Sequence, residues 1–176
     1  CNLMDLIIVP SSFSKQVIET SSEYHNLKLK TEIMVIQESF DYDLSKVSSS
    51  DRKSVDDFLN QVTEDFCFAT FGEWDVDSAN PNDRKNIETM LRTFYESFDN
   101  TDDVAFILKV NNRNYTQDDF DSILNKIKQI KSDYDKTPSV YLLHSNLKKS
   151  QLNYLHSHEK IKCCVFATKG EGFGRS

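Results

Sequence analysis

The sequence predicts an α/β fold in which a parallel β-sheet carries helices on both faces. From residue 64 onward, four short apolar runs alternate with three longer amphipathic runs. This alternation is typical of parallel strands joined by crossover helices. In addition, three of the chain's four glycines follow the last apolar run, where an open α/β sheet presents its carboxyl edge to a ligand.

The four apolar runs are predicted to be buried strands, because they are short and rich in Val, Ile, Leu and Phe. They cover residues 66–71, 104–110, 139–143 and 161–167. Between them, apolar side chains recur at helical spacing in three stretches: Leu91, Phe94, Tyr95 and Phe98; then Phe120, Ile123, Leu124, Ile127 and Ile130; then Leu147, Leu152 and Leu155. This order predicts a Rossmann-like, doubly wound unit.

The first of these helices has a clear predicted start. Asn80-Pro81-Asn82-Asp83 has the composition of a turn, and the Asp83 carboxylate can accept from the backbone N–H groups that follow it. We therefore expect Arg84 and Lys85 to lie in the first turn of this helix.

The first 45 residues do not continue the regular alternation. A predicted strand at residues 6–10, a helix at 14–20 and a strand at 32–36 are followed by a helix at 52–62, which the run Ser48-Ser49-Ser50-Asp51 would cap. We expect residues 1–45 to be the remnant of a preceding domain with its linker, and residues 46–176 to be a truncated second domain. The strand at residues 6–10 should then lie outside the main sheet. The first residue is Cys, with no leader sequence before the strand, so the chain is expected to begin within a longer protein.

The composition disfavours several classes of function. A net charge of -7 over 176 residues argues against a nucleic-acid partner or a membrane surface, both of which require clustered Lys and Arg. The longest apolar runs are far shorter than the roughly 20 residues of a transmembrane helix, so no transmembrane segment is expected. The four cysteines fit neither a disulfide framework nor a zinc site. We expect reduced thiols and a cytoplasmic location.

The most informative motif follows the last predicted strand, in the sequence Thr168-Lys169-Gly170-Glu171-Gly172-Phe173-Gly174-Arg175-Ser176. Glycines at the carboxyl end of a parallel strand let the backbone approach a ligand closely, and a following helix start can hold a phosphate. The residues alone therefore predict a phosphate-binding or sugar-binding loop.

This loop resembles the donor-domain signature of the GT4-like glycosyltransferases (glycosyl transferases group 1), which have the GT-B fold. The resemblance extends over almost the whole chain. Residues 1–21 resemble the last strand and helix of the family's acceptor domain, and residues 32–36 with Phe40 resemble the linker. Gly72-Glu73-Trp74, Asp83-Arg84-Lys85-Asn86, residues 104–109 and residues 140–144 resemble successive parts of the donor domain. The implied fold is a partial GT-B C-terminal domain.

The resemblance implies a site for a nucleotide-sugar donor. Lys85 would reach the pyrophosphate, and Glu171 would be the catalytic residue, accepting hydrogen bonds from hydroxyls of the transferred sugar. The other substrate-binding candidates are Arg84, Gly172, Phe173, Gly174, Lys109 and His144, the last two because they end predicted strands. The implied reaction retains the anomeric configuration and needs no cofactor or metal. The two Asp-x-Asp triplets, at residues 41–43 and 75–77, are interpreted as solvated acidic turns.

Two departures from the family leave an alternative open. Glu73 stands where family members commonly carry a basic residue. A second glutamate, which usually binds the ribose, would fall three positions past Ser176. The alternative is therefore a non-catalytic module derived from the GT-B fold that binds a nucleotide sugar or another protein. In the enzyme hypothesis, this fragment is expected to be inactive by itself, and the acceptor, a glycan, a lipid or a protein, stays open.

Overall fold

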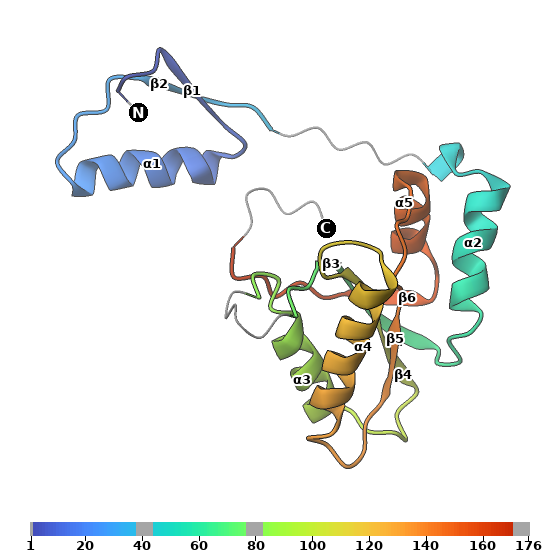
Figure 1. Cartoon of the computed structure of the whole chain (residues 1–176). Coiled ribbons are helices and arrows are strands. Elements are labelled where there is room, and N and C mark those ends of the chain that lie inside the picture. Colours follow the sequence, from blue (N-terminus) through green and yellow to red (C-terminus); the bar gives the residue numbers. More distant parts are fainter. Residues whose placement is uncertain (1, 38–43, 77–82, 171–176) are drawn as a thin grey trace. The chain divides into compact units, whose positions relative to one another are not determined.

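The computed structural model describes residues 2–37, 44–76 and 83–170 (Figure 1). These residues fall into two compact units, residues 2–37 and residues 44–170. The larger unit holds every candidate site residue that the structure describes.

The larger unit is built on a parallel sheet of four strands in the order β5-β4-β3-β6. The strands are β3 (Phe66–Glu73), β4 (Val104–Asn111), β5 (Ser139–Leu142) and β6 (Ile161–Cys164). Six consecutive residues of the central strand β4 are buried, as expected for a strand covered on both faces. The α/β fold with a parallel sheet, predicted from the alternation of apolar runs, is confirmed.

Helices cover both faces of this sheet (Figure 1). On one face, α3 (Ile87–Ser97) and α4 (Gln117–Lys131) pack against alternate residues of β4: Phe106, Leu108 and Val110. On the other face, α2 (Ser49–Leu59) and α5 (Lys149–Ser157) pack against Ala105 and Ile107. Because successive side chains of a strand point to opposite faces, a single run of apolar residues serves two hydrophobic layers.

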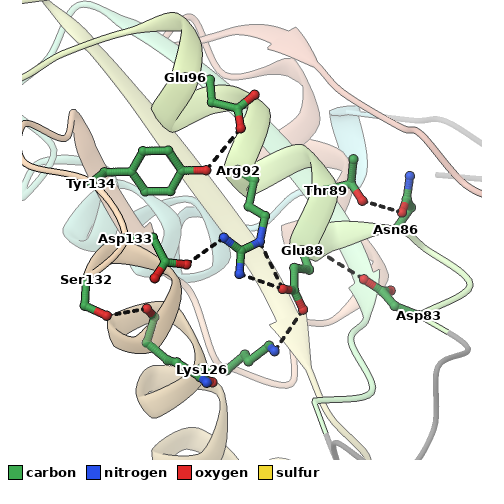
Figure 2. Close-up of polar contacts among 11 residues, drawn as sticks. Asp83, Asn86, Glu88, Thr89, Arg92, Glu96, Lys126, Ser132, Asp133 and Tyr134 are labelled. Atoms are coloured by element: carbon green, nitrogen blue, oxygen red, sulfur yellow. Dashed lines mark hydrogen bonds and ion pairs between the residues drawn. The ribbon is translucent and has the colours of Figure 1, made fainter.

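A polar network joins α3 to the C-terminal half of α4 (Figure 2). The Glu88 carboxylate accepts from Arg92 Nη2 at 3.0 Å and from Lys126 Nζ at 2.8 Å, and Arg92 also contacts Asp133 at 2.8 Å. These side chains are partly exposed, so each pair adds little to stability. Together they connect α3 to α4 and to the turn that follows α4.

Several predicted boundaries are wrong by a few residues. Strand β6 ends at Cys164 rather than at Ala167. It is an edge strand that pairs only with β3, with a register shift between Cys67 and Phe68, and its last backbone hydrogen bond runs from the Val165 N–H to Ala69 O at 2.8 Å. Helix α2 begins at Ser49, earlier than predicted, since Ser48 Oγ accepts from the Asp51 N–H at 3.1 Å and acts as the N-cap.

The smaller unit contains β1 (Leu6–Val9), α1 (Ser12–Tyr24) and β2 (Glu32–Val35). The larger unit begins with a short 3-10 helix, η1 (Leu44–Lys46). The strands β1 and β2 pair in parallel in a two-stranded sheet of their own. The prediction that residues 6–10 lie outside the main sheet is therefore confirmed. In β1 and β2 only Val9 and Ile33 are buried, while Phe13 and Tyr24 on α1 are largely exposed.

Candidate functional site

The strand order places a topological switch point at the carboxyl edge of the sheet, between β3 and β6. From β3 the chain adds β4 and then β5 on one side, and it returns to add β6 on the other side. In open α/β sheets, ligands bind outside the carboxyl ends of the strands at such a point. The residues that follow β3 and β6 are therefore the first candidates for a binding site.

Gly72 brings the Lys85 side chain close to the end of β3. Its φ of +147° lies in a region that other residues rarely adopt, and a Cβ added there would lie 3.1 Å from Lys85 Cε. Only glycine meets both conditions without strain. The aliphatic part of Lys85 consequently lies against the backbone at the end of the strand.

Arg84 and Lys85 lie in a turn that precedes α3, so the prediction that they belong to its first turn is wrong. Asn86 takes a left-handed conformation (φ 57°) and donates its N–H to Asp83 O at 3.0 Å. The physical reason is that Asn tolerates this conformation, which separates the turn from the helix. The predicted role of Asp83 is confirmed, because its Oδ2 accepts from the Glu88 N–H at 3.0 Å.

Arg84 joins this turn to the segment that follows β6. Its carbonyl oxygen accepts from the Lys169 N–H at 2.9 Å, and its Nη1 donates to the Gly170 carbonyl oxygen at 2.8 Å. The basic pair Arg84-Lys85 therefore lies beside the residues that lead into the glycine loop. The four loop candidates lie outside the described residues: Glu171, Gly172, Phe173 and Gly174.

Lys109, near the end of β4, is a buried cation. Lys109 is only 5% exposed. Its Nζ donates a hydrogen bond to Tyr115 Oη at 3.2 Å and lies 4.9 Å from the centre of the Tyr115 ring. Burial lowers the pKa of Lys109 to about 8. Within residues 2–37, 44–76 and 83–170, no carboxylate forms an ion pair with Lys109.

His144, just past β5, is paired with a buried acid. Its Nε2 lies 2.9 Å from Asp119 Oδ2, and both side chains are 5% exposed. Asp119 also accepts from the backbone N–H groups of Asn112 and Arg113, at 2.9 and 3.0 Å. Burial opposes ionisation of Asp119, but the hydrogen bonds from His144 and these backbone groups outweigh it and hold its pKa below the usual value. Since an ionised carboxylate only accepts, His144 donates from Nε2.

Tyr115 connects these two candidates. Its ring covers the Lys109 ammonium and lies 5.4 Å from the His144 ring, centre to centre. We name Lys109, Tyr115, Asp119 and His144 the β4–β5 cluster. Sequence reasoning found Lys109 and His144, at strand ends, but missed Tyr115 and Asp119. The signal for Asp119 was the spacing Thr116-x-x-Asp119, since Thr116 Oγ1 accepts from the Asp119 N–H at 3.3 Å and caps α4.

Two aromatic residues at this edge serve packing. Trp74 is 1% exposed within the core formed with α3 and α4. His156 of α5 stacks on Phe71 at 3.9 Å, and its burial lowers the pKa of the imidazole. The cations at the edge are therefore better candidates for ligand contacts than either of these residues.

Neither a known family model nor a curated protein matches this chain. None of the helices in residues 2–37, 44–76 and 83–170 has the length and apolar character needed to span a membrane.

Proposed function

We propose that the chain is the donor-binding part of a GT4-like glycosyltransferase. The protein would transfer a sugar from a nucleoside-diphosphate sugar to an acceptor hydroxyl, with retention of configuration and without a metal ion. The contact of Arg84 with Gly170 carries this proposal. It brings the basic pair Arg84-Lys85 and the start of the glycine loop together at the switch point of the sheet, where a phosphate-containing ligand is expected to bind.

The residues at this point have the chemistry that the transfer requires. The Lys85 ammonium would neutralise negative charge on the diphosphate as it leaves the sugar. Glu171, in the glycine loop, would accept hydrogen bonds from the sugar hydroxyls. Gly72 supports the first role, since the absence of a side chain there lets Lys85 lie against the sheet edge.

Glu73 favours a second candidate function, in which the chain binds a nucleotide sugar without catalysis. Its carboxylate ends β3, next to the proposed diphosphate position, where it repels an anion. The two functions differ in the turnover of the full-length protein, since this fragment is expected to be inactive in either case. A full-length protein that binds nucleoside diphosphates with dependence on Lys85, but releases none from a nucleotide sugar with any acceptor, would support the binding module.

A calorimetric titration tests the proposed site. The wild-type protein and Lys85→Ala are each titrated with UDP, GDP and ADP, and with uridine, guanosine and adenosine. For the diphosphate that binds, we expect Lys85→Ala to lose about 1.5–3 kcal/mol of binding free energy, the scale of a charge-assisted hydrogen bond. Binding of the nucleoside should not change, because the nucleoside lacks the phosphates.

Lys136→Ala is a matched control, because Lys136 is an exposed lysine before β5, at the opposite edge of the sheet. It should bind like the wild type. An equal loss for diphosphate and nucleoside in Lys85→Ala would indicate a disturbed fold, and no loss for either would remove Lys85 from the site. No binding of any diphosphate by the wild type would overturn the proposed function.

A further inference from the structure

Among the described residues of the larger unit, the buried charged residues are Asp51, Lys109 and Asp119. Lys109 differs from the other two because no described residue supplies it with an opposite charge. Asp51 pairs with Lys148 at 3.0 Å, and Asp119 pairs with His144 at 2.9 Å. Lys109 contacts only the hydroxyl and ring of Tyr115 among the described residues.

An isolated buried ammonium is costly, because it has lost its hydration without gaining an opposite charge. A neutral phenol and a cation–π contact offset only part of this cost. Such an arrangement persists in a well-packed sheet when a ligand supplies the missing negative charge. Packing alone would be served better by an apolar side chain at this position.

The position of Lys109 agrees with contact to a ligand. It lies near the carboxyl end of β4, opposite Phe71 of β3 in the register and one residue before the partner of Gly72. Its cover, Tyr115, is 41% exposed, so the ammonium lies under a surface side chain and not under the core. A second polar group in the same region is also unsatisfied, since Asn112 Oδ1 is buried without a hydrogen-bond partner.

We propose that Lys109 is an anion-binding residue whose ammonium contacts a phosphate oxygen of the ligand at this sheet edge, with Tyr115 as the residue that positions it. The proposal rests on the proposed function, which supplies the class of ligand, a nucleoside diphosphate. Lys109 would also provide a cation on β4, the strand next to β3. At the end of β3, Glu73 stands where the family resemblance would lead us to expect a basic residue.

The pH dependence of binding follows from the protonation of Lys109. With a pKa of about 8 in the free protein, Lys109 loses its charge above that pH, and an anion that needs the charge binds more weakly. Among the described residues, the other titratable groups around this edge of the sheet are Glu73, Lys85, Tyr115, Asp119, His144 and His156. They are unchanged when Lys109 alone is replaced, so the difference between two proteins isolates Lys109.

Lys109→Met is the variant that tests this, because methionine keeps the apolar stem and removes the charge. Wild type and variant are titrated with inorganic pyrophosphate and with UDP, GDP and ADP at pH 7 and pH 9.5. We expect the variant to bind about tenfold more weakly at pH 7, the scale of one charge-assisted contact. At pH 9.5 the difference should fall below about twofold, because only about 3% of Lys109 is then charged in the free wild-type protein.

A direct measurement in the wild type covers the case in which Lys109→Met does not fold. Carbon NMR of the Lys109 Cε should show titration near pH 8. Saturating pyrophosphate should raise this pKa by about one pH unit, because an anion that binds about tenfold more tightly to charged Lys109 must favour protonation by the same factor. Tyr115→Phe, which keeps the ring but removes the hydroxyl, should weaken pyrophosphate binding severalfold at pH 7 and retain the pH dependence.

The outcomes separate this inference from the proposed function. If Lys85→Ala weakens diphosphate binding while Lys109→Met binds like the wild type at pH 7, the proposed function stands and the role of Lys109 is overturned. If pyrophosphate binds with dependence on Lys109 but no nucleoside diphosphate binds, Lys109 is an anion site and the proposed function fails. If the wild type binds none of the probes, both are overturned.

Discussion

Replacing Lys109 with Met should stabilise the protein at neutral pH, a result opposite to that of most substitutions at buried positions. Burial lowers the pKa of Lys109 to about 8 from the usual 10.5. At about 1.4 kcal/mol per pH unit between these values, holding the charge in the folded protein costs on the order of 3 kcal/mol. The variant loses the hydrogen bond to Tyr115, worth about 1 kcal/mol. We therefore expect a net gain of about 2 kcal/mol in the free energy of unfolding at pH 7.

The gain should disappear at high pH. Between about pH 8 and 10.5 the unfolded wild type binds the Lys109 proton and the folded protein does not, so wild-type stability rises with pH over this window. The variant lacks this rise. Urea unfolding of both proteins at pH 7, 8.5 and 10 measures the difference, and groups that both proteins share, such as Cys67 and Tyr95, cancel. A variant less stable than the wild type at pH 7 would refute the reasoning, since the charge would then be compensated in the fold.

Two further substitutions test the geometry of the same edge. Asp119→Asn should lower the free energy of unfolding at pH 7 by about 2–3 kcal/mol, because the amide cannot accept all the hydrogen bonds that the carboxylate accepts. The difference in stability between the variant and the wild type should narrow as the pH falls below 3.8. The pKa of Asp119 is lower in the folded wild type than in the unfolded chain, so protonation at low pH removes the stability that the ionised carboxylate contributes. Gly72→Ala should cost about 1–3 kcal/mol in urea unfolding, the scale of a strained backbone conformation. Adding Lys85→Ala to it should recover little, because the strain is in the backbone; full recovery would show that only the Lys85 contact mattered.

The periodicity of apolar residues was sufficient to predict most of the larger unit. The runs that became β3 and β4 are the central strands, and burial on both faces demands apolar residues at consecutive positions. Prediction was less accurate at the edge strand β6. There the strand ends at Cys164, with one more backbone hydrogen bond from the Val165 N–H to Ala69 O at 2.8 Å, although apolar residues continue to Ala167. The neighbouring β3 continues to Glu73, so no local pattern of residues marks the end of β6.

The candidate site shows a sharper division. Lys109 and His144 could be found in the sequence because they end predicted strands. Tyr115 and Asp119 could not be assigned to the site, because they come from the loop after β4 and the start of α4, and only the folded chain brings them to Lys109 and His144. The turn at Arg84 was also mispredicted, since the left-handed Asn86 is a single-residue conformation with no periodic signal.

The sequence by itself determined the class of fold and the order of strands and helices, because these follow from hydrophobic periodicity. It also predicted which strand ends are candidates for a binding site, from the position of the glycines. Only the tertiary structure decided which of those ends meet. The strand order β5-β4-β3-β6 placed Arg84 beside Gly170, far apart in the sequence, and left Lys109 buried without a carboxylate among the described residues. The physical reason is that strand order and charge compensation depend on contacts between distant segments, which no local pattern of residues encodes.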